Sequence, residues 1–309
     1  MGRSLRCSAA LLAGLALLSS CQSRDEPAAP GHPEGAVRVG SFDFPESVLL
    51  GEIYAATLED QGVDVVRELG AGPREAVAPA LEQDLLDLVP EYLGTSLLFV
   101  TLGEAGLPSS PAAAHEALVR AYGERGVTVL DYAPAQNQNV IAVTTETARE
   151  HALARISDLR PVAPEMTFGG PPECPLRPLC LRGLERTYGL AFDAFLPLDT
   201  GGPMTVAALT AGEVDVGLLF STDPVIDDPE LTLLRDDRDL QPAENVVPVV
   251  RSEVAERLGR QALEAIDRVS ARLTTDGLRT LNAQVALDVE PALEPADVAV
   301  AWLREEGLI

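Results

Sequence analysis

The hydrophobic and polar positions of this chain follow one pattern twice, in the same register and 128 residues apart. Each copy has the end of a helix, a short turn, an aspartate, an apolar strand and then an aromatic residue. The first copy covers 80–92 and ends on Tyr92, and the second covers 208–220 and ends on Phe220. In open α/β sheets, ligands bind outside the carboxyl ends of the strands. The repeat therefore predicts two lobes that each bring one aromatic side chain to a shared cleft, although two ordinary αβ units could match in this way.

The rest of the chain alternates between short apolar runs and segments with helical spacing, which indicates an α/β fold. We expect strands at 37–40, 63–69, 127–131 and 140–144, and helices at 46–61, 74–85, 94–102 and 111–125. A polar segment at 132–139 and an extended run at 245–250 read as two crossings between lobes, which would form a hinge. This organisation predicts a discontinuous lobe 1 at 36–135 plus 246–309, with its C-terminal part helical, and a lobe 2 at 136–245.

The first 21 residues have the features of a targeting segment. Two arginines precede a short apolar run at 9–18, which is too short to span a bilayer. Small residues directly before Cys21 resemble the bacterial lipobox, in which the signal is cleaved and the cysteine is lipidated; an ordinary secretory signal is the alternative. Residues 22–35 are rich in Pro, Ala, Gly and charge and read as a flexible tether. We therefore expect an extracytoplasmic protein, anchored by lipid to the outer face of the cell membrane.

Two cysteines remain once Cys7 and Cys21 are assigned to the leader. Cys174 and Cys180 lie in a proline-dense loop, where a disulfide would stiffen a segment with little regular structure. A catalytic redox pair is the alternative, but such pairs usually have two intervening residues and this one has five. The spacing therefore favours a structural disulfide.

The charge of the chain narrows the possible partners. A net charge of −25 argues against nucleic acid and favours cationic ligands by long-range attraction. All 23 basic residues are arginine, so lysine-based Schiff-base chemistry and P-loop phosphate binding are excluded. The three histidines are scattered, which predicts no metal site, and no Gly-x-Ser-x-Gly motif marks a nucleophile. We therefore expect neither a cofactor nor an enzymatic activity.

Several segments, in order along nearly the whole chain after the leader, resemble the osmoprotectant-binding proteins of ABC importers. The matching segments are 39–46, 50–54, 90–95, 183–190, 212–216 and 221–223. The resemblance implies a type II periplasmic-binding-protein fold, with two α/β lobes, a two-crossing hinge and a cleft between them. It also implies a quaternary amine as ligand (glycine betaine, choline or carnitine), and a permease with its ATPase as partners. A quaternary ammonium has no hydrogen-bond donor, so aromatic faces hold it by cation–π attraction.

The resemblance implies roles for nine residues. Tyr92 and Phe220 match cage aromatics of the two lobes, Thr95 a hydroxyl donor, and Arg177 a carboxylate-binding arginine. The full set is Phe42, Tyr92, Thr95, Gln138, Asn139, Arg177, Phe220, Thr222 and Asp223. Asp223 could equally cap a turn. Gly94 would let the start of its helix approach the ligand closely.

Three departures from the family pattern bear on the ligand. Phe42 replaces a lysine common in relatives, Asn139 stands where many have an aromatic, and Met204 lies where another tyrosine is frequent. An amide-lined pocket would suit choline, a carnitine-like molecule or a ligand with several hydroxyls better than glycine betaine, and Tyr132 could replace a lost ring. The alternatives are a same-fold receptor for an uncharged or polyhydroxyl ligand, a sensory or scaffold lipoprotein, and an exported thiol oxidoreductase using Cys174 and Cys180.

Overall fold

The computed structural model describes residues 35–309 except 104–105, 107, 109 and 287–292. The expected leader with Cys21, and the tether apart from Gly35, lie outside the described residues. Over the part of the chain that is described, no helix combines the length and the apolar character that crossing a membrane requires.

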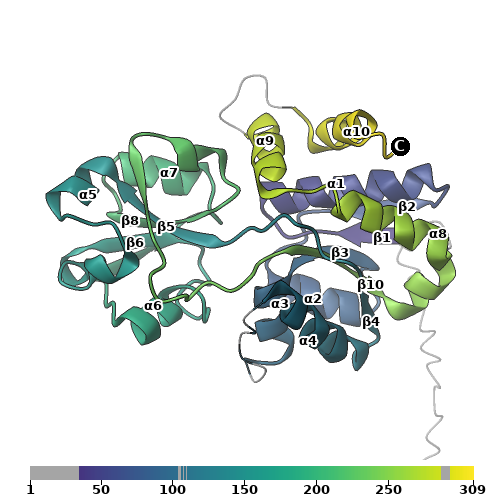
Figure 1. The fold of residues 1–309 in the computed structure, drawn as a ribbon, viewed down its shortest axis with the longest axis horizontal. Coiled ribbons are helices and arrows are strands. Elements are labelled where there is room, and N and C mark those ends of the chain that lie inside the picture. The colour runs from purple at the N-terminus through teal and green to yellow at the C-terminus, as the bar shows by residue number, and fades with distance from the viewer. Residues whose placement is uncertain (1–34, 104–105, 107, 109, 287–292) are drawn as a thin grey trace, which may run out of the picture. The chain divides into compact units, whose positions relative to one another are not determined.

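The first sheet has the strand order β2-β1-β3-β10-β4. Its strands are β1 Val37–Gly40, β2 Val65–Glu68, β3 Leu88–Tyr92, β4 Val127–Val129 and β10 Val246–Arg251. Helices cover both faces: α1, α8, α9 and α10 lie on one side and α2, α3 and α4 on the other (Figure 1). These helices are α1 Pro45–Asp60, α2 Arg74–Glu82, α3 Leu93–Val100, α4 Pro111–Gly123, α8 Ser252–Ser270, α9 Thr275–Val285 and α10 Pro295–Glu305. Because both faces are covered, every residue of the central strand β3 is buried.

The second sheet repeats this plan with the order β7-β6-β8-β5-β9. Its strands are β5 Asn139–Thr144, β6 Thr167–Gly170, β7 Ala194–Pro197, β8 Val216–Phe220 and β9 Leu231–Leu234. The helical elements around it are α5 Thr145–Glu150, α6 Leu181–Tyr188, α7 Pro203–Thr210 and the short 3-10 turns η1 Ile156–Leu159, η2 Ala163–Glu165 and η3 Pro224–Asp227. In each sheet four strands run in the same direction, and the strand that enters from the other lobe, β10 or β5, is antiparallel to them. We call the parts around the first and second sheets lobe 1 and lobe 2.

Two crossing segments join the lobes, between β4 and β5 and between β9 and β10. They pair with each other: Gln136 and Asn245 form an antiparallel bridge, and the Asn137 N–H donates to the Glu244 carbonyl at 2.9 Å. The start of α3 packs tightly on the second crossing, because a Cβ on Gly94 would lie 2.4 Å from Pro242 Cγ. The small residue at position 94 is therefore needed against Pro242, and its close approach to a ligand remains a prediction.

The two copies of the sequence repeat occupy equivalent places, since each supplies the third strand of its sheet. Asp87 and Asp215 precede these strands and fix them to the neighbouring strand in the same way. The Asp87 carboxylate accepts the Arg38 N–H at 2.8 Å, and that of Asp215 accepts the Thr167 N–H at 2.7 Å. The predicted aromatic is the last residue of β3 and of β8, so the internal repeat is confirmed as a repeat of structure.

Most predicted elements agree with the structure to within a few residues. The strand expected at 63–69 is shorter, Val65–Glu68, and the helix expected at 74–85 ends at Glu82. The predicted helix extends too far because Asp84 adopts a left-handed backbone conformation, with φ of 63°. This conformation is incompatible with a right-handed helix, so α2 ends before β3. The C-terminal segment is helical where it is described, in α8, α9 and α10.

Candidate ligand-binding site

A cavity of about 300 Å³ is bordered by residues of both lobes, at the carboxyl ends of β1, β3 and β8. Its volume is at the small end of the range for ligand pockets, which fits a small molecule. Its walls are mostly apolar and aromatic, with a few polar and charged side chains. Six of the nine predicted site residues line it: Phe42, Tyr92, Thr95, Asn139, Arg177 and Phe220.

Four aromatic side chains form one cluster beside the cavity. Phe42 and Phe44 stack with ring centroids 6.0 Å apart, and Tyr92 lies 6.5 Å from Phe42 and 6.1 Å from Phe44. Phe220 of lobe 2 completes the cluster at 5.5 Å from Phe44. Phe42 and Phe44 follow β1, while Tyr92 and Phe220 end their strands, so strand ends in both lobes place the rings. The cluster can offer aromatic surface to a cation from both lobes.

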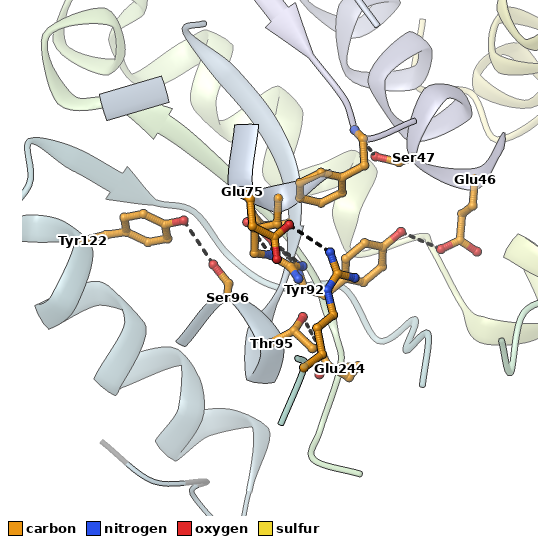
Figure 2. A network of polar contacts seen from close by, with 12 residues as sticks. Glu46, Ser47, Glu75, Tyr92, Thr95, Ser96, Tyr122 and Glu244 are labelled. Atoms are coloured by element: carbon orange, nitrogen blue, oxygen red, sulfur yellow. Dashed lines mark hydrogen bonds and ion pairs between the residues drawn. The ribbon is translucent and has the colours of Figure 1, made fainter. Parts of the chain in front are cut away.

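The Tyr92 hydroxyl is fixed by a buried carboxylate on the first turn of α1. It donates a hydrogen bond of 2.7 Å to Glu46 Oε1, and Figure 2 shows this contact. Glu46 also accepts from the side-chain amides of Asn137, at 2.8 Å, and Asn282, at 2.8 Å. Burial and the neighbouring Glu46 raise the pKa of Tyr92 well above its usual value. The tyrosine therefore stays neutral, and its ring is held in one orientation.

A partly buried arginine, Arg74, lies against the face of Phe42. The Arg74 Cζ is 4.9 Å from the ring centroid, and its Nε and Nη2 donate to the Glu91 carboxylate, the shortest distance being 2.9 Å. Burial alone would lower the pKa of Arg74, but the ion pair with Glu91 outweighs it and raises that pKa. Arg74 therefore remains charged and covers one face of an aromatic ring that the sequence assigned to the cage.

Glu244, on the second crossing, brings a buried carboxyl group to the cavity wall. Its Oε2 accepts a hydrogen bond of 3.2 Å from the Thr95 hydroxyl, a contact drawn in Figure 2. Its Oε1 is buried and has no hydrogen-bond partner in the described part of the chain. Burial raises the pKa of Glu244 to about 8, against the opposing effects of Arg74 and the hydrogen bonds from Thr95.

The cysteine loop forms part of the wall in lobe 2. Cys174 and Cys180 are joined by a disulfide and both are buried, so the expected pairing is present. The Leu179 carbonyl, next to Cys180, accepts from the Asn139 amide at 3.2 Å, which positions this amide at the cavity. Arg177 extends from the same loop to Glu75 of α2, with Nη2 and Oε2 3.0 Å apart. This ion pair joins the two lobes between residues that both line the cavity.

Three predicted site residues do not line the cavity. Gln138 links the two crossing segments, because its side-chain amide donates a hydrogen bond to the Pro242 carbonyl at 2.6 Å. Thr222 is buried, and its carbonyl accepts from Asn282 at 3.0 Å. Asp223 precedes η3 and accepts the Phe220 N–H at 3.2 Å, which is the turn-capping role considered as its alternative. Thr222 and Asp223 belong to the turn that follows Phe220, and the role of all three residues in binding remains a prediction.

The lining residues that were not assigned from the sequence include Phe44, Arg74, Asn137 and Glu244. Phe44 lies two residues after Phe42 in a Phe-Asp-Phe-Pro stretch, and this aromatic spacing was an available signal. Neither Tyr132, which packs on His115 with centroids 5.3 Å apart, nor the exposed Met204 lines the cavity. No group of His, Cys, Asp and Glu able to hold a metal ion occurs among the described residues.

Comparison with known proteins agrees with this geometry. Residues 35–305 match the family model described as the substrate-binding domain of ABC-type glycine betaine transport systems. The chain is 30% identical to a glycine-betaine-binding protein of Pseudomonas aeruginosa over 88% of both chains. It is 29% identical to the glycine betaine-binding protein YehZ of Escherichia coli, over 88% of this chain and 90% of the relative.

A solved structure of a glycine betaine/carnitine/choline ABC transporter component shares the fold, with a TM-score of 0.68 and 23% identity over 88% of this chain and 99% of the other. The type II periplasmic-binding-protein fold expected from the sequence is therefore confirmed. The match to the family model spans nearly all described residues and includes both of the lobes that border the cavity. The chain belongs to the family of substrate-binding domains of ABC-type glycine betaine transport systems.

Proposed function

We propose that this chain binds a quaternary ammonium compound in the cavity between its lobes and delivers it to the permease of an ABC importer. Membership of the family makes the chain the substrate-binding component of an ABC transport system, which works with a permease and an ATPase, and not an enzyme. The observation that carries the proposal is the aromatic cluster of Phe42, Phe44, Tyr92 and Phe220, drawn from both lobes to one cavity.

Physical chemistry favours this ligand class. An aromatic face attracts a cation with about 0.5–2 kcal/mol, depending on desolvation. Because a trimethylammonium group is apolar on its surface and positive as a whole, aromatic rings satisfy both properties at once. The excess of acidic residues along the chain adds long-range attraction for a cation.

The paired crossings support closure of the lobes around a ligand. We propose lobes at 36–135 plus 246–309 and at 136–245, and two crossing segments that hydrogen-bond to each other support this division. A ligand that contacts both lobes binds the closed form more tightly and so shifts the population toward it. The permease would then recognise the closed form.

Export and lipid anchoring are part of the proposal and rest on the sequence. The basic residues, short apolar run and Ser-Ser-Cys ending of residues 1–21 support a lipoprotein signal with Cys21 as the lipid site. Mass spectrometry of the protein from its native membrane would test this point. The expected product begins at a diacylated Cys21, and a Cys21→Ala variant is released from the membrane.

Calorimetry of the purified chain with glycine betaine, choline, carnitine and a sugar tests the ligand class. We expect micromolar or tighter binding of at least one quaternary amine and no binding of the sugar. Tyr92→Ala removes a ring of the cluster and should abolish detectable binding, whereas Tyr132→Ala, outside the cavity, should leave the affinity nearly unchanged. Binding of the sugar alone would favour the uncharged or polyhydroxyl ligand instead.

The thiol oxidoreductase alternative receives no support from the site. Its two cysteines form a disulfide, and the exposed fraction is 0% for Cys174 and 3% for Cys180. A redox-active pair needs an accessible thiolate, which burial opposes. The pair instead stiffens the loop that positions Arg177 and the Leu179 carbonyl.

A further inference from the structure

Among the described lining residues of the cavity, the buried side-chain atoms that lack a hydrogen-bond partner are acceptors. They are two oxygens, Glu244 Oε1 and Asn137 Oδ1. The orientation of the Asn137 amide follows from its contact with Glu46, since the nitrogen must face the carboxylate. A buried acceptor left without a donor costs free energy, so a ligand that supplies donors is favoured here.

The positive groups of the cavity are already paired with carboxylates. Arg74 binds Glu91 through Nε and Nη2, and Arg177 binds Glu75. Asp43, Glu173 and Glu244 add further carboxyl groups to the wall without an arginine partner. A ligand carboxylate would therefore have to share arginines that already neutralise Glu91 and Glu75, in a cavity with an excess of acidic groups.

We propose that Glu244 selects the ligand's charge, so that the cavity prefers a hydroxylated quaternary ammonium cation of the choline type over a zwitterion such as glycine betaine. This inference rests on the proposed function and specifies its substrate class. The cation lies against the aromatic cluster, and its hydroxyl donates to Glu244 Oε1. Thr95 holds the other oxygen of Glu244 and thereby orients the acceptor.

The pH dependence follows from the groups that face Glu244. These are Arg74 from α2 and Glu91 from β3, while Thr95 from α3 and Asn137 from the first crossing carry no charge. A bound cation favours the ionised carboxylate, so binding of choline should strengthen as pH rises toward and through the pKa of about 8. A ligand carboxylate is repelled by the ionised form, so binding of glycine betaine should weaken over the same range.

The simplest alternative is that Glu244 only supports the start of α3. The Ala243 and Asn245 carbonyls already accept the Gly94 and Leu93 N–H groups at 3.1 Å each, so this segment has a clear structural role. A purely structural role would change the affinities for choline and glycine betaine alike. The ratio of the two affinities therefore separates the alternatives.

Calorimetry of the purified chain with choline, glycine betaine and 3,3-dimethylbutan-1-ol, an uncharged analogue of choline, tests the inference at pH about 6 and about 9. We expect choline to bind about tenfold tighter than glycine betaine at the higher pH, and the uncharged analogue to bind weakly. Glu244→Gln keeps the size of the side chain and should remove both this preference and its pH dependence. Glu185→Gln, which removes an exposed acid of lobe 2 outside the cavity, should change the ratio by less than about threefold.

The outcomes distinguish a failure of the role assigned to Glu244 from a failure of the proposed receptor function. Tighter binding of glycine betaine at high pH, or an equal loss of both affinities in Glu244→Gln, overturns the role of Glu244 and leaves the receptor function intact. Binding of the uncharged analogue as tightly as choline, or of none of these compounds, overturns both.

Discussion

Phe44 of lobe 1 and Phe220 of lobe 2 are in ring contact, with centroids 5.5 Å apart and planes inclined by 43°. Rings this close leave no space for a trimethylammonium group between them, so a ligand must bind where the rings face the cavity or must separate them. In either case the two side chains lie where the lobes meet. The contact also shows that the cluster is continuous across the lobes in this arrangement.

Replacing either ring should weaken binding without removing it. We expect Phe44→Leu and Phe220→Leu each to reduce the affinity for a quaternary amine by about 0.5–2 kcal/mol, because leucine fills space but has no π face. Calorimetry measures this loss. Phe195→Leu is the matched control, since Phe195 is partly buried against the core of lobe 2 and does not line the cavity. An equal loss in the control would show that the effect arises from stability and not from cation–π contact.

Removing the Tyr92 hydroxyl should cost stability more than it costs binding. Tyr92→Phe keeps the aromatic face and deletes one of the hydrogen bonds to the buried Glu46 carboxylate, at a cost of about 1.5–3 kcal/mol in the free energy of unfolding. Urea unfolding gives this value. Tyr54→Phe deletes a buried bond to the neutral Ser270 hydroxyl and should cost less, about 0.5–1.5 kcal/mol. A larger loss for Tyr54→Phe would contradict the role assigned to Glu46.

The lobes and the aromatic strand ends were predictable because they depend on local patterns. Tyr92 and Phe220 each end an apolar run that follows a helix and an aspartate, and this spacing appears directly in the sequence. The disulfide was predictable for a similar reason, since few cysteines remain after the leader. These features need only short-range periodicity and composition.

The polar part of the site depends on contacts that no local pattern reveals. Glu46 reads as an ordinary acidic residue of a helix first turn, but its donors come from positions 46, 91 and 236 residues away. Glu244 lies in an irregular crossing, and its partner Thr95 is 149 residues distant. Their burial results from the pairing of the crossings and the packing of α3, which only the tertiary structure shows.

The turn before each third strand allows a test of backbone conformation without a change in packing. Gly212, in the second copy of the repeat, has φ of 70°, and an added Cβ would meet no atom within 4 Å. We expect Gly212→Ala to lower the free energy of unfolding by about 1 kcal/mol, because a left-handed conformation disfavours a side chain. Gly123→Ala is the control: it also has open space, but its position at the end of α4 is helical, so it should stabilise by up to about 1 kcal/mol. Thermal unfolding measures both, and the same sign for the two variants would refute the argument.

The pH dependence of stability should report on Asp223. Burial, with a smaller contribution from Glu46 and Asp199, raises the pKa of this carboxyl group to about 7. The folded state therefore holds a proton that the unfolded state loses near its ordinary pKa of about 3.9. Because the folded state binds more protons over this interval, stability falls as pH rises from about 4 to about 7 and changes no further from this group above that range.

Asp223→Asn should flatten this decline. Between pH about 5 and about 8, the wild-type chain should lose roughly 2–3 kcal/mol more free energy of unfolding than the variant, because only the wild type must ionise a buried carboxyl group. Urea titrations at the two pH values give the difference. Asp193→Asn, at an exposed position of the same lobe, should retain the wild-type slope. A variant at position 223 with an unchanged slope would place the titrating group elsewhere, and Glu244→Gln would then be the next variant to measure, since its raised pKa acts in the same direction.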